Sequence, residues 1–244
     1  MLACTLRASS TVSKIAWRRS LSALTNKIDE NVARAGEQIV LQYNSIGEGL
    51  KWTLKDTKRY ASALASGLQE IGFVKGDSIA TRLNNDRPEK HVALMAAMIN
   101  GTYLVSIDPK ISDPEKTRSI LREHKCKMLI YDEPDIPHLE SMAPEFTEHD
   151  AVMCKPLIVG GLPHLKYFVT IALDMQIASH NYAYFLAYDR GLRPTESSDG
   201  TLAYVDYSAD DKRTEFTHST ILDSSPDVFP YLNALIKPTP LIYE

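Results

Sequence analysis

Residues 207–220, YSADDKRTEFTHST, have the outline of a nucleotide phosphate loop. An aromatic residue and a serine lead through a polar stretch to the pair Thr217 and His218. A phosphate loop needs glycines, because the phosphate must approach the backbone closely and accept several N–H groups. This stretch has no glycine, and Asp210 and Asp211 would place negative charge beside the anion. The sequence therefore predicts a solvated turn of mixed charge that does not hold a phosphate.

Other catalytic patterns are absent from the sequence. It has no G-x-S-x-G turn, no G-x-x-x-x-G-K-[ST] loop and no G-x-G-x-x-G turn. The carboxylate-rich residues 131–140 predict a charged loop after a strand, and Gly160 and Gly161 predict a turn. Lys212 and Arg213 could meet a phosphate as point charges, but a surface turn accounts for both. We predict no catalytic, cofactor-binding or metal-binding residue.

The composition is that of a packed globular chain, with 244 residues of which 44% are hydrophobic. The net charge of -4 gives no basic field that would draw the folded part onto nucleic acid. Its apolar runs stay below the roughly 18 to 20 residues that span a bilayer, so no transmembrane span is predicted. Cys4, Cys126 and Cys154 are odd in number and form no C-x-x-C pair, which predicts neither a disulfide framework nor a zinc site.

The first 28 residues are basic and contain no acidic residue. Their cations stand among Ser, Thr, Ala and Leu, and the first carboxylate is Asp29. This composition is typical of a mitochondrial presequence, which is either removed after import or retained. A basic amphipathic helix on a membrane surface or in the groove of a partner is the alternative interpretation.

The region after residue 50 predicts helices and strands in alternation. Thr53 and Asp56 have capping-box spacing ahead of a helix that Gly72 ends. A second helix has Asp86 as its cap and ends at Gly101. A third helix is expected over residues 113–124, and strands over residues 78–83, 102–107 and 127–131. Since single helices between strands usually give parallel pairing, we predict an α/β fold, a parallel-rich sheet with helices on both faces.

This α/β region resembles the acyl-CoA synthetases and related adenylate-forming enzymes. In residues 52–86 a Leu-x-x-x-Gly-hydrophobic turn is followed by Lys-Gly-Asp. The positions that carry this match are Gly72, Lys75, Gly76 and Asp77. The likeness continues through residues 91–132, then thins, and returns in residues 162–171 and 207–220. The resemblance implies a truncated N-terminal domain of an adenylate-forming enzyme.

Enzymes of this family have a Ser/Thr/Gly-rich phosphate loop that ends in Pro-Lys-Gly and is followed by a Thr-His pair. The outer positions of that loop are matched here by Tyr207, Ser208, Thr217 and His218, while the glycines between them are replaced. The family's later nucleotide-binding segments, its hinge and its small domain with the catalytic lysine have no counterpart in the sequence. We therefore expect a pseudoenzyme that binds no cofactor.

Together these features favour a non-catalytic structural subunit of a mitochondrial multi-protein complex. Inner-membrane respiratory complexes and ATP synthase are the leading candidates, with the chain on the matrix side and held at the membrane by partner subunits. The expected organisation is a presequence-like segment (1–28), an acyl-CoA synthetase-like domain (29–222) and a proline-rich, extended tail (223–244). The tail is expected to anchor on a neighbour or, as the alternative, to fold back on its own domain.

Two other functions stay open at the level of sequence. The chain could be half of a split adenylate-forming enzyme whose loop, hinge and lysine come from a second chain. It could also be a binding module that keeps an acyl or CoA pocket without catalysis. Both alternatives keep a link to acyl activation, whereas the structural-subunit hypothesis does not.

Overall fold

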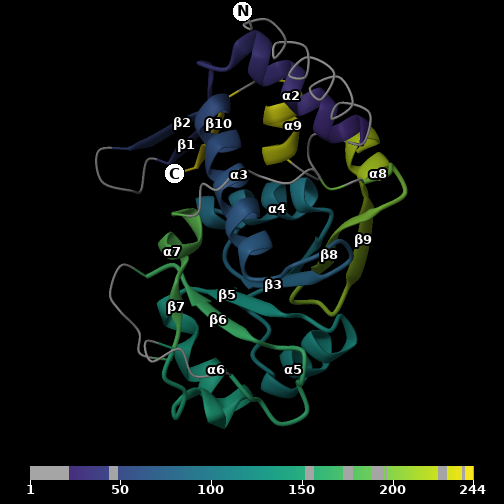
Figure 1. Ribbon diagram of the computed structural model, residues 1–244. Helices are drawn as coiled ribbons and strands as arrows, with labels where there is room; N and C mark the ends of the chain where they lie inside the picture. The colour runs from purple at the N-terminus through teal and green to yellow at the C-terminus, as the bar shows by residue number, and fades with distance from the viewer. Residues whose placement is uncertain are drawn as a thin grey trace, which may run out of the picture.

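A seven-stranded sheet forms the centre of the fold (Figure 1). The computed structural model describes residues 22–43, 49–151, 157–172, 178–187, 195, 197–224, 230–237 and 240–243. The strands run in the order β7-β6-β5-β3-β4-β8-β9, and every neighbouring pair is parallel except β8 and β9. The predicted parallel-rich α/β sheet is confirmed. Its strands are β3 (Ser78–Arg82), β4 (Tyr103–Ile107), β5 (Met128–Tyr131), β6 (Tyr167–Thr170), β7 (His180–Asn181), β8 (Leu202–Tyr207) and β9 (Arg213–Thr217).

Helices cover both faces of this sheet. The helices α3 (Leu54–Glu70) and α4 (Pro88–Asn100) lie on one side, while α5 (Pro114–Glu123) and α6 (Ile136–Met142) lie on the other (Figure 1). Successive residues of a strand point to opposite faces, so Ile79 packs in the core beneath α3 and α4, and Ala80 in the core beneath α5 and α6. The short helix α7 (Tyr182–Leu186) packs against α3. The sheet therefore separates two hydrophobic cores.

The helix boundaries follow local sequence signals at most ends. Asp56 N donates to Thr53 Oγ1 (3.1 Å) and Thr53 N to Asp56 Oδ2 (3.2 Å), which is the predicted capping box. Gly101 follows α4 in the left-handed region, with φ 67°. The predicted cap at Asp86 is wrong. The helix begins one residue later, at Pro88, and Arg87 occupies the cap position without a side-chain hydrogen bond.

The charged stretch of residues 131–140 is helical rather than the predicted loop. It contains a 3-10 turn, η1 (Glu133–Asp135), and the first residues of α6. Asp132 accepts a hydrogen bond from Glu133 N (2.8 Å) and so caps the turn. Asp135 forms an ion pair of 3.2 Å with Arg82, which is 1% exposed at the end of β3. One of the carboxylates that suggested a solvated loop therefore compensates a buried cation.

A smaller layer is built from both ends of the chain. It contains α2 (Ala23–Ala35), β1 (Ile39–Tyr43), β2 (Leu50–Thr53), α9 (Pro230–Ile236) and β10 (Leu241–Tyr243). The order of its sheet is β10-β1-β2, with β1 parallel to β10 and antiparallel to β2. In Figure 1, α2 and α9 lie side by side above the helices of the main sheet, and the two helices are in contact. Segments about 200 residues apart thus form one unit.

The structure describes part of each end of the chain, and it contradicts the extended path expected for the tail. The expected segment 1–28 includes the start of α2, in which Leu24 and Ile28 are fully buried; residues 1–21 lie outside the described residues. The expected extended tail is helical over residues 230–236, where Leu232 and Leu235 are fully buried. Leucines three residues apart lie on one helical face and can pack onto a neighbouring helix. This part of the tail folds back on its own domain, which was the alternative interpretation.

The exposed hydrophobic side chains of the described residues do not come from one element. Ile39 is 37% exposed, and four others are more exposed: Val74, Ile158, Tyr184 and Ile242. Singly exposed side chains of this kind are normal on a protein surface. Within the described part of the chain, no helix combines the length and the apolar character that a bilayer-spanning segment requires.

Candidate functional site

The candidate phosphate loop is a tight antiparallel hairpin. β8 and β9 pair directly, with Tyr207 opposite Arg213, and residues 208–212 form the turn between them (Figure 1). Ser208 N donates to Lys212 O (3.1 Å), and Asp211 N donates to Ser208 O (3.1 Å). These backbone groups are bonded within the turn. They are therefore not directed at a common point, as the amides of a phosphate-binding loop must be.

The side chains of the turn are also engaged with one another. The Ser208 hydroxyl donates to Asp210, which lowers the pKa of that carboxyl, and the same hydroxyl lies 3.1 Å from Lys212 O. Asp211 adopts φ 64°, a left-handed conformation that is uncommon without glycine. Its carboxylate forms an ion pair of 3.0 Å with Lys116 of α5. The turn thus presents carboxylates where a phosphate loop presents N–H groups.

The cation that follows the turn is already paired. The Arg213 guanidinium forms ion pairs with Glu123 and Glu215, and it lies over the Tyr207 ring at 5.8 Å from the centroid. Binding a phosphate would require Arg213 to exchange two carboxylate partners for one anion. The hairpin therefore lacks an unpaired arginine that could replace the lost N–H donors.

Tyr207, the first residue of the candidate loop, faces the interior. It is 6% exposed, and its hydroxyl lies 2.9 Å from His124 Nε2 and 3.4 Å from Glu123 Oε2. Burial raises the pKa of Tyr207 to about 12 and lowers the pKa of His124. The neutral forms of both groups are favoured, which suits a packed polar contact rather than an acid–base pair.

The Thr-His pair after the hairpin has structural roles. Thr217 is the cap of α8 (His218–Asp223): Thr220 N donates to Thr217 Oγ1 (3.3 Å) and Thr217 N to Thr220 Oγ1 (2.7 Å). Reciprocal bonds of this kind satisfy N–H groups at the start of a helix. Thr217 is therefore the last residue of β9 and the cap of α8.

His218 is fully buried against the start of α2. Its Nδ1 shares a hydrogen bond of 2.7 Å with Ser22 Oγ, and its Nε2 has no hydrogen-bond partner among the described residues. Burial lowers the pKa of His218 to about 4, although the nearby Asp199 carboxylate acts in the opposite direction. Ser22 also caps α2 by accepting from Thr25 N (3.4 Å). A serine and a histidine are therefore in contact, but no bulk solvent or substrate reaches the imidazole.

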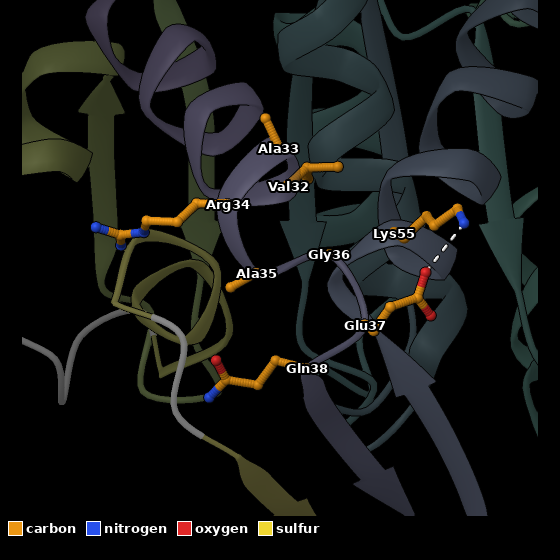
Figure 2. A pocket seen from close by; sticks show the side chains of 8 residues that line it. All are labelled: Val32, Ala33, Arg34, Ala35, Gly36, Glu37, Gln38 and Lys55. Carbon is orange, nitrogen blue, oxygen red and sulfur yellow. Dashed lines mark hydrogen bonds and ion pairs between the residues drawn. The ribbon is translucent and has the colours of Figure 1, made fainter.

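A surface hollow of about 520 Å³ lies at the other end of α2 (Figure 2). It is lined by residues 32–38 and Lys55, and a 3.0 Å ion pair joins Lys55 Nζ to Glu37 Oε1. These two side chains are 68% and 81% exposed, so water screens the pair. The lining side chains include no hydroxyl, thiol or imidazole. The groups of the hollow that could act as nucleophiles are the Lys55 amine and the Glu37 carboxylate, and these are paired with each other.

The remaining candidates for chemistry are buried or dispersed. Across the described ranges, no three His, Cys, Asp or Glu side chains are grouped as metal ligands would be. Cys126 is buried, and burial raises its pKa to about 12; Cys4 and Cys154 lie outside the described residues. Gly160 and Gly161 form the predicted turn.

Residues 28–208 match the protein family described as "AMP-binding enzyme". The chain belongs to the AMP-binding enzyme family. The family match includes β8 and ends at Ser208, the first residue of the hairpin turn. The predicted membership is confirmed, and the altered turn lies at the point where the family match stops. No curated protein sequence matches this member of the AMP-binding enzyme family.

Solved structures of ligases share the fold of this family member at low sequence identity. The anthranilate CoA ligase AuaEII in complex with anthranoyl-AMP is 16% identical, with a TM-score of 0.64 over 80% of this chain and 34% of that chain. A fatty acyl CoA synthetase from Mycobacterium tuberculosis is 14% identical, with a TM-score of 0.69 over 91% and 44%. Coronafacic acid ligase from Pectobacterium brasiliense is 14% identical, with a TM-score of 0.68 over 91% and 45%. This family member thus spans less than half the length of each.

These similarities identify the main sheet as that of the N-terminal domain of adenylate-forming enzymes. The sequence predicted a solvated turn over residues 207–220, but the turn is confined to residues 208–212, and Tyr207 and His218 are buried. Ser22 and Glu123 carried no signal that could have linked them to the loop. Arg82 did carry one, because a charged residue within the predicted strand of residues 78–83 indicates a buried partner.

Proposed function

We propose that this member of the AMP-binding enzyme family is a non-catalytic, structural subunit of a mitochondrial multi-protein complex. Inner-membrane respiratory complexes and ATP synthase are the leading candidates. The chain would lie on the matrix side and reach the membrane through partner subunits. In this proposal the adenylate-forming fold is kept for its shape, and the nucleotide chemistry is lost.

The hairpin of residues 207–217 is the observation that carries the proposal. The backbone N–H groups of Ser208 and Asp211 are bonded within the turn, the aspartates at 210 and 211 add negative charge, and Arg213 is paired with two glutamates. An ATP phosphate would therefore lose charge-assisted bonds and meet carboxylates at close range. A chain with this hairpin is not expected to activate a carboxylate by adenylation.

Thermal denaturation of the full-length protein with ATP or AMP tests the loss of nucleotide binding. A ligand at a hundred times its dissociation constant stabilises the folded state by roughly 2.7 kcal/mol. For a domain of this size that energy raises the Tm by about 5–10 °C. We expect no rise, while an acyl-CoA ligase with an intact glycine-rich loop serves as the positive control.

Two variants sharpen this test. Asp210→Gly combined with Asp211→Gly removes the repulsion, yet it is expected not to restore binding because the pairing of β8 with β9 and the two carboxylate partners of Arg213 remain. Saturable binding of ATP at micromolar concentration by the unmodified chain, lost in Lys212→Ala, would overturn the pseudoenzyme proposal. Lys212 is the matched choice because its exposed side chain carries the turn's own positive charge.

Native gel fractionation of mitochondria tests the structural role. The chain is expected to co-migrate with a large complex and to be depleted from the free pool. A monomeric, freely soluble pool with no co-migrating complex would contradict the proposal. Crosslinking within the co-migrating band would then identify the neighbouring subunits.

A second candidate is half of a split adenylate-forming ligase. It is favoured by the family match of residues 28–208, because the solved structures that share this fold are ligases. Affinity purification would in that case recover a protein with an intact glycine-rich loop and a small lysine-bearing domain. Adenylation activity would appear only when both chains are present, which the structural role does not allow.

A further inference from the structure

Strand β9 is the last strand of the main sheet (Figure 1). Among the described residues its one strand neighbour is β8, so no described strand pairs with its other edge. An edge strand presents a row of backbone N–H and C=O groups that can hydrogen-bond to another strand. The outer edge of β9 is therefore a candidate docking surface.

The register of β8 and β9 determines which backbone groups of β9 face outward. The Tyr207 carbonyl accepts a hydrogen bond (3.0 Å) from the N–H of Asp108, the residue that follows β4. The backbone of Tyr207 is therefore directed toward β4, and Arg213, which lies opposite Tyr207, is not hydrogen-bonded to it. The same geometry recurs two residues further along β9. The N–H and C=O groups of Arg213 and Glu215 thus point away from β8.

The side chains of these two residues carry opposite charges. Arg213 and Glu215 are two residues apart and so lie on one face of β9, with side chains 41% and 48% exposed. Along the strand the edge is therefore positive, neutral at Thr214, and negative. A second copy that runs antiparallel about Thr214 places each Arg213 opposite a Glu215. A parallel copy in the same register would instead place like charges opposite each other, which is unfavourable.

We propose that two copies of this chain associate through their β9 edges, antiparallel and about a two-fold axis beside Thr214. In each of the two Arg213–Glu215 pairs both residues have outward-facing backbone groups, so the pair exchanges two hydrogen bonds. The contact uses the same surface of both copies and is closed after two of them. This inference goes beyond the proposed structural role and does not depend on the cellular location.

Protection of the sheet edge is the competing explanation of these charges. Charged side chains on an edge strand commonly prevent pairing with another chain, because like charges opposite each other repel. The charges of β9 have the reverse effect in the antiparallel arrangement. Arg213 also pairs with Glu123 of its own copy, so each copy brings one carboxylate in excess. This excess weakens the contact, and we therefore expect association that depends on protein concentration.

Sedimentation equilibrium of the full-length protein, from low micromolar to submillimolar concentration, tests the proposal. We expect an equilibrium between monomer and dimer without larger species, because the two-fold contact is closed. A protein that stays monomeric throughout this range overturns the proposal. Open-ended association into larger species overturns it as well.

Two charge reversals test the pairing itself. Glu215→Arg places arginines opposite each other and Arg213→Glu places glutamates opposite each other, so each variant alone should dimerise at least about tenfold more weakly. A mixture of the two variants restores opposite charges in both pairs and is expected to recover dimerisation, as heterodimers. Lys51→Glu, at an exposed residue of β2, is the control and should dimerise as the unmodified chain does. Absence of recovery in a mixture of folded variants contradicts the proposed pairing.

A cysteine at Thr214 tests the position of the axis even if a charge variant does not fold. Opposite residues of a non-hydrogen-bonded antiparallel pair have Cα atoms roughly 4.5 Å apart, which a disulfide can span. In a Cys4→Ser/Cys154→Ser background, Thr214→Cys is expected to give a covalent dimer on oxidation with diamide. Lys212→Cys, in the adjoining turn, is the matched control and should stay monomeric because its two copies lie away from the axis. Equal crosslinking of both variants, or of neither, overturns the antiparallel contact.

Discussion

The pH dependence of folding stability should contain a contribution from His218. The pKa of its imidazole is about 4 in the folded protein, because burial disfavours the charged form, against an ordinary value of 6.5. Between these pH values the unfolded chain binds a proton that the folded chain does not, so stability falls as the pH falls. The stabilising contribution is fully present above pH 6.5. As the pH falls from there toward about 4, the free energy of unfolding drops by up to about 1.4 kcal/mol per pH unit, roughly 3 kcal/mol in all.

Urea denaturation at several pH values between about 4.5 and 7.5 measures this term. His218→Asn removes the titrating group while its amide can still meet Ser22, so the variant is expected to lose less stability on acidification than the wild-type protein. Comparing the slopes of unfolding free energy against pH removes any loss of stability that does not depend on pH. His164→Asn, at an exposed histidine, is the control and is expected to keep the wild-type slope. If His218→Asn and the wild-type protein had the same slope, the imidazole would not be held neutral by burial.

Two further predictions concern buried groups of the main sheet. Arg82→Met leaves the Asp135 carboxylate and two backbone carbonyls without their buried partner. The variant should lower the free energy of unfolding, measured by urea denaturation, by roughly 3–5 kcal/mol. Adding Asp135→Asn should recover part of this loss, and no recovery would contradict the pairing. Because burial raises the pKa of the Cys126 thiol to about 12, iodoacetamide should not modify it in the native Cys4→Ser/Cys154→Ser protein at about pH 8. Intact mass reports this, and modification at the rate of a free thiol would count against it.

The strands β3, β4 and β5 and the helices between them were predicted because their signals are local, whereas β6, β7, β8 and β9 were not predicted. Each of these three strands lies next to a helix with a recognisable cap or stop, as at Thr53 and Gly101. Alternation of strands and single helices then leaves few topologies. The family likeness at residues 52–132 rests on the same signals, which is why fold and family could be inferred together.

The candidate site was predictable only as far as its position in the chain. The absence of glycine in residues 207–220 correctly indicated a turn of mixed charge, but the role of His218 depends on Ser22, which is 196 residues away. The same limit applies to Asp135, because a carboxylate looks solvated until its buried partner Arg82 is known. Long-range pairs between polar side chains leave no periodic pattern in a single sequence.

The pairing of β1 with β10 has a consequence for how the protein reaches its native state. Leu41 lies opposite Leu241, so about 200 residues of chain must be closed into a loop before this strand pair forms. Closing a loop of that length is entropically unfavourable, and contacts of high sequence separation slow folding. The main sheet can assemble from shorter-range contacts as the chain emerges, whereas the part of α2 that contacts α9 stays uncovered until that C-terminal helix is made. During that interval the early helix is a natural target for chaperones, and a pause near the end of synthesis or translocation would prolong it.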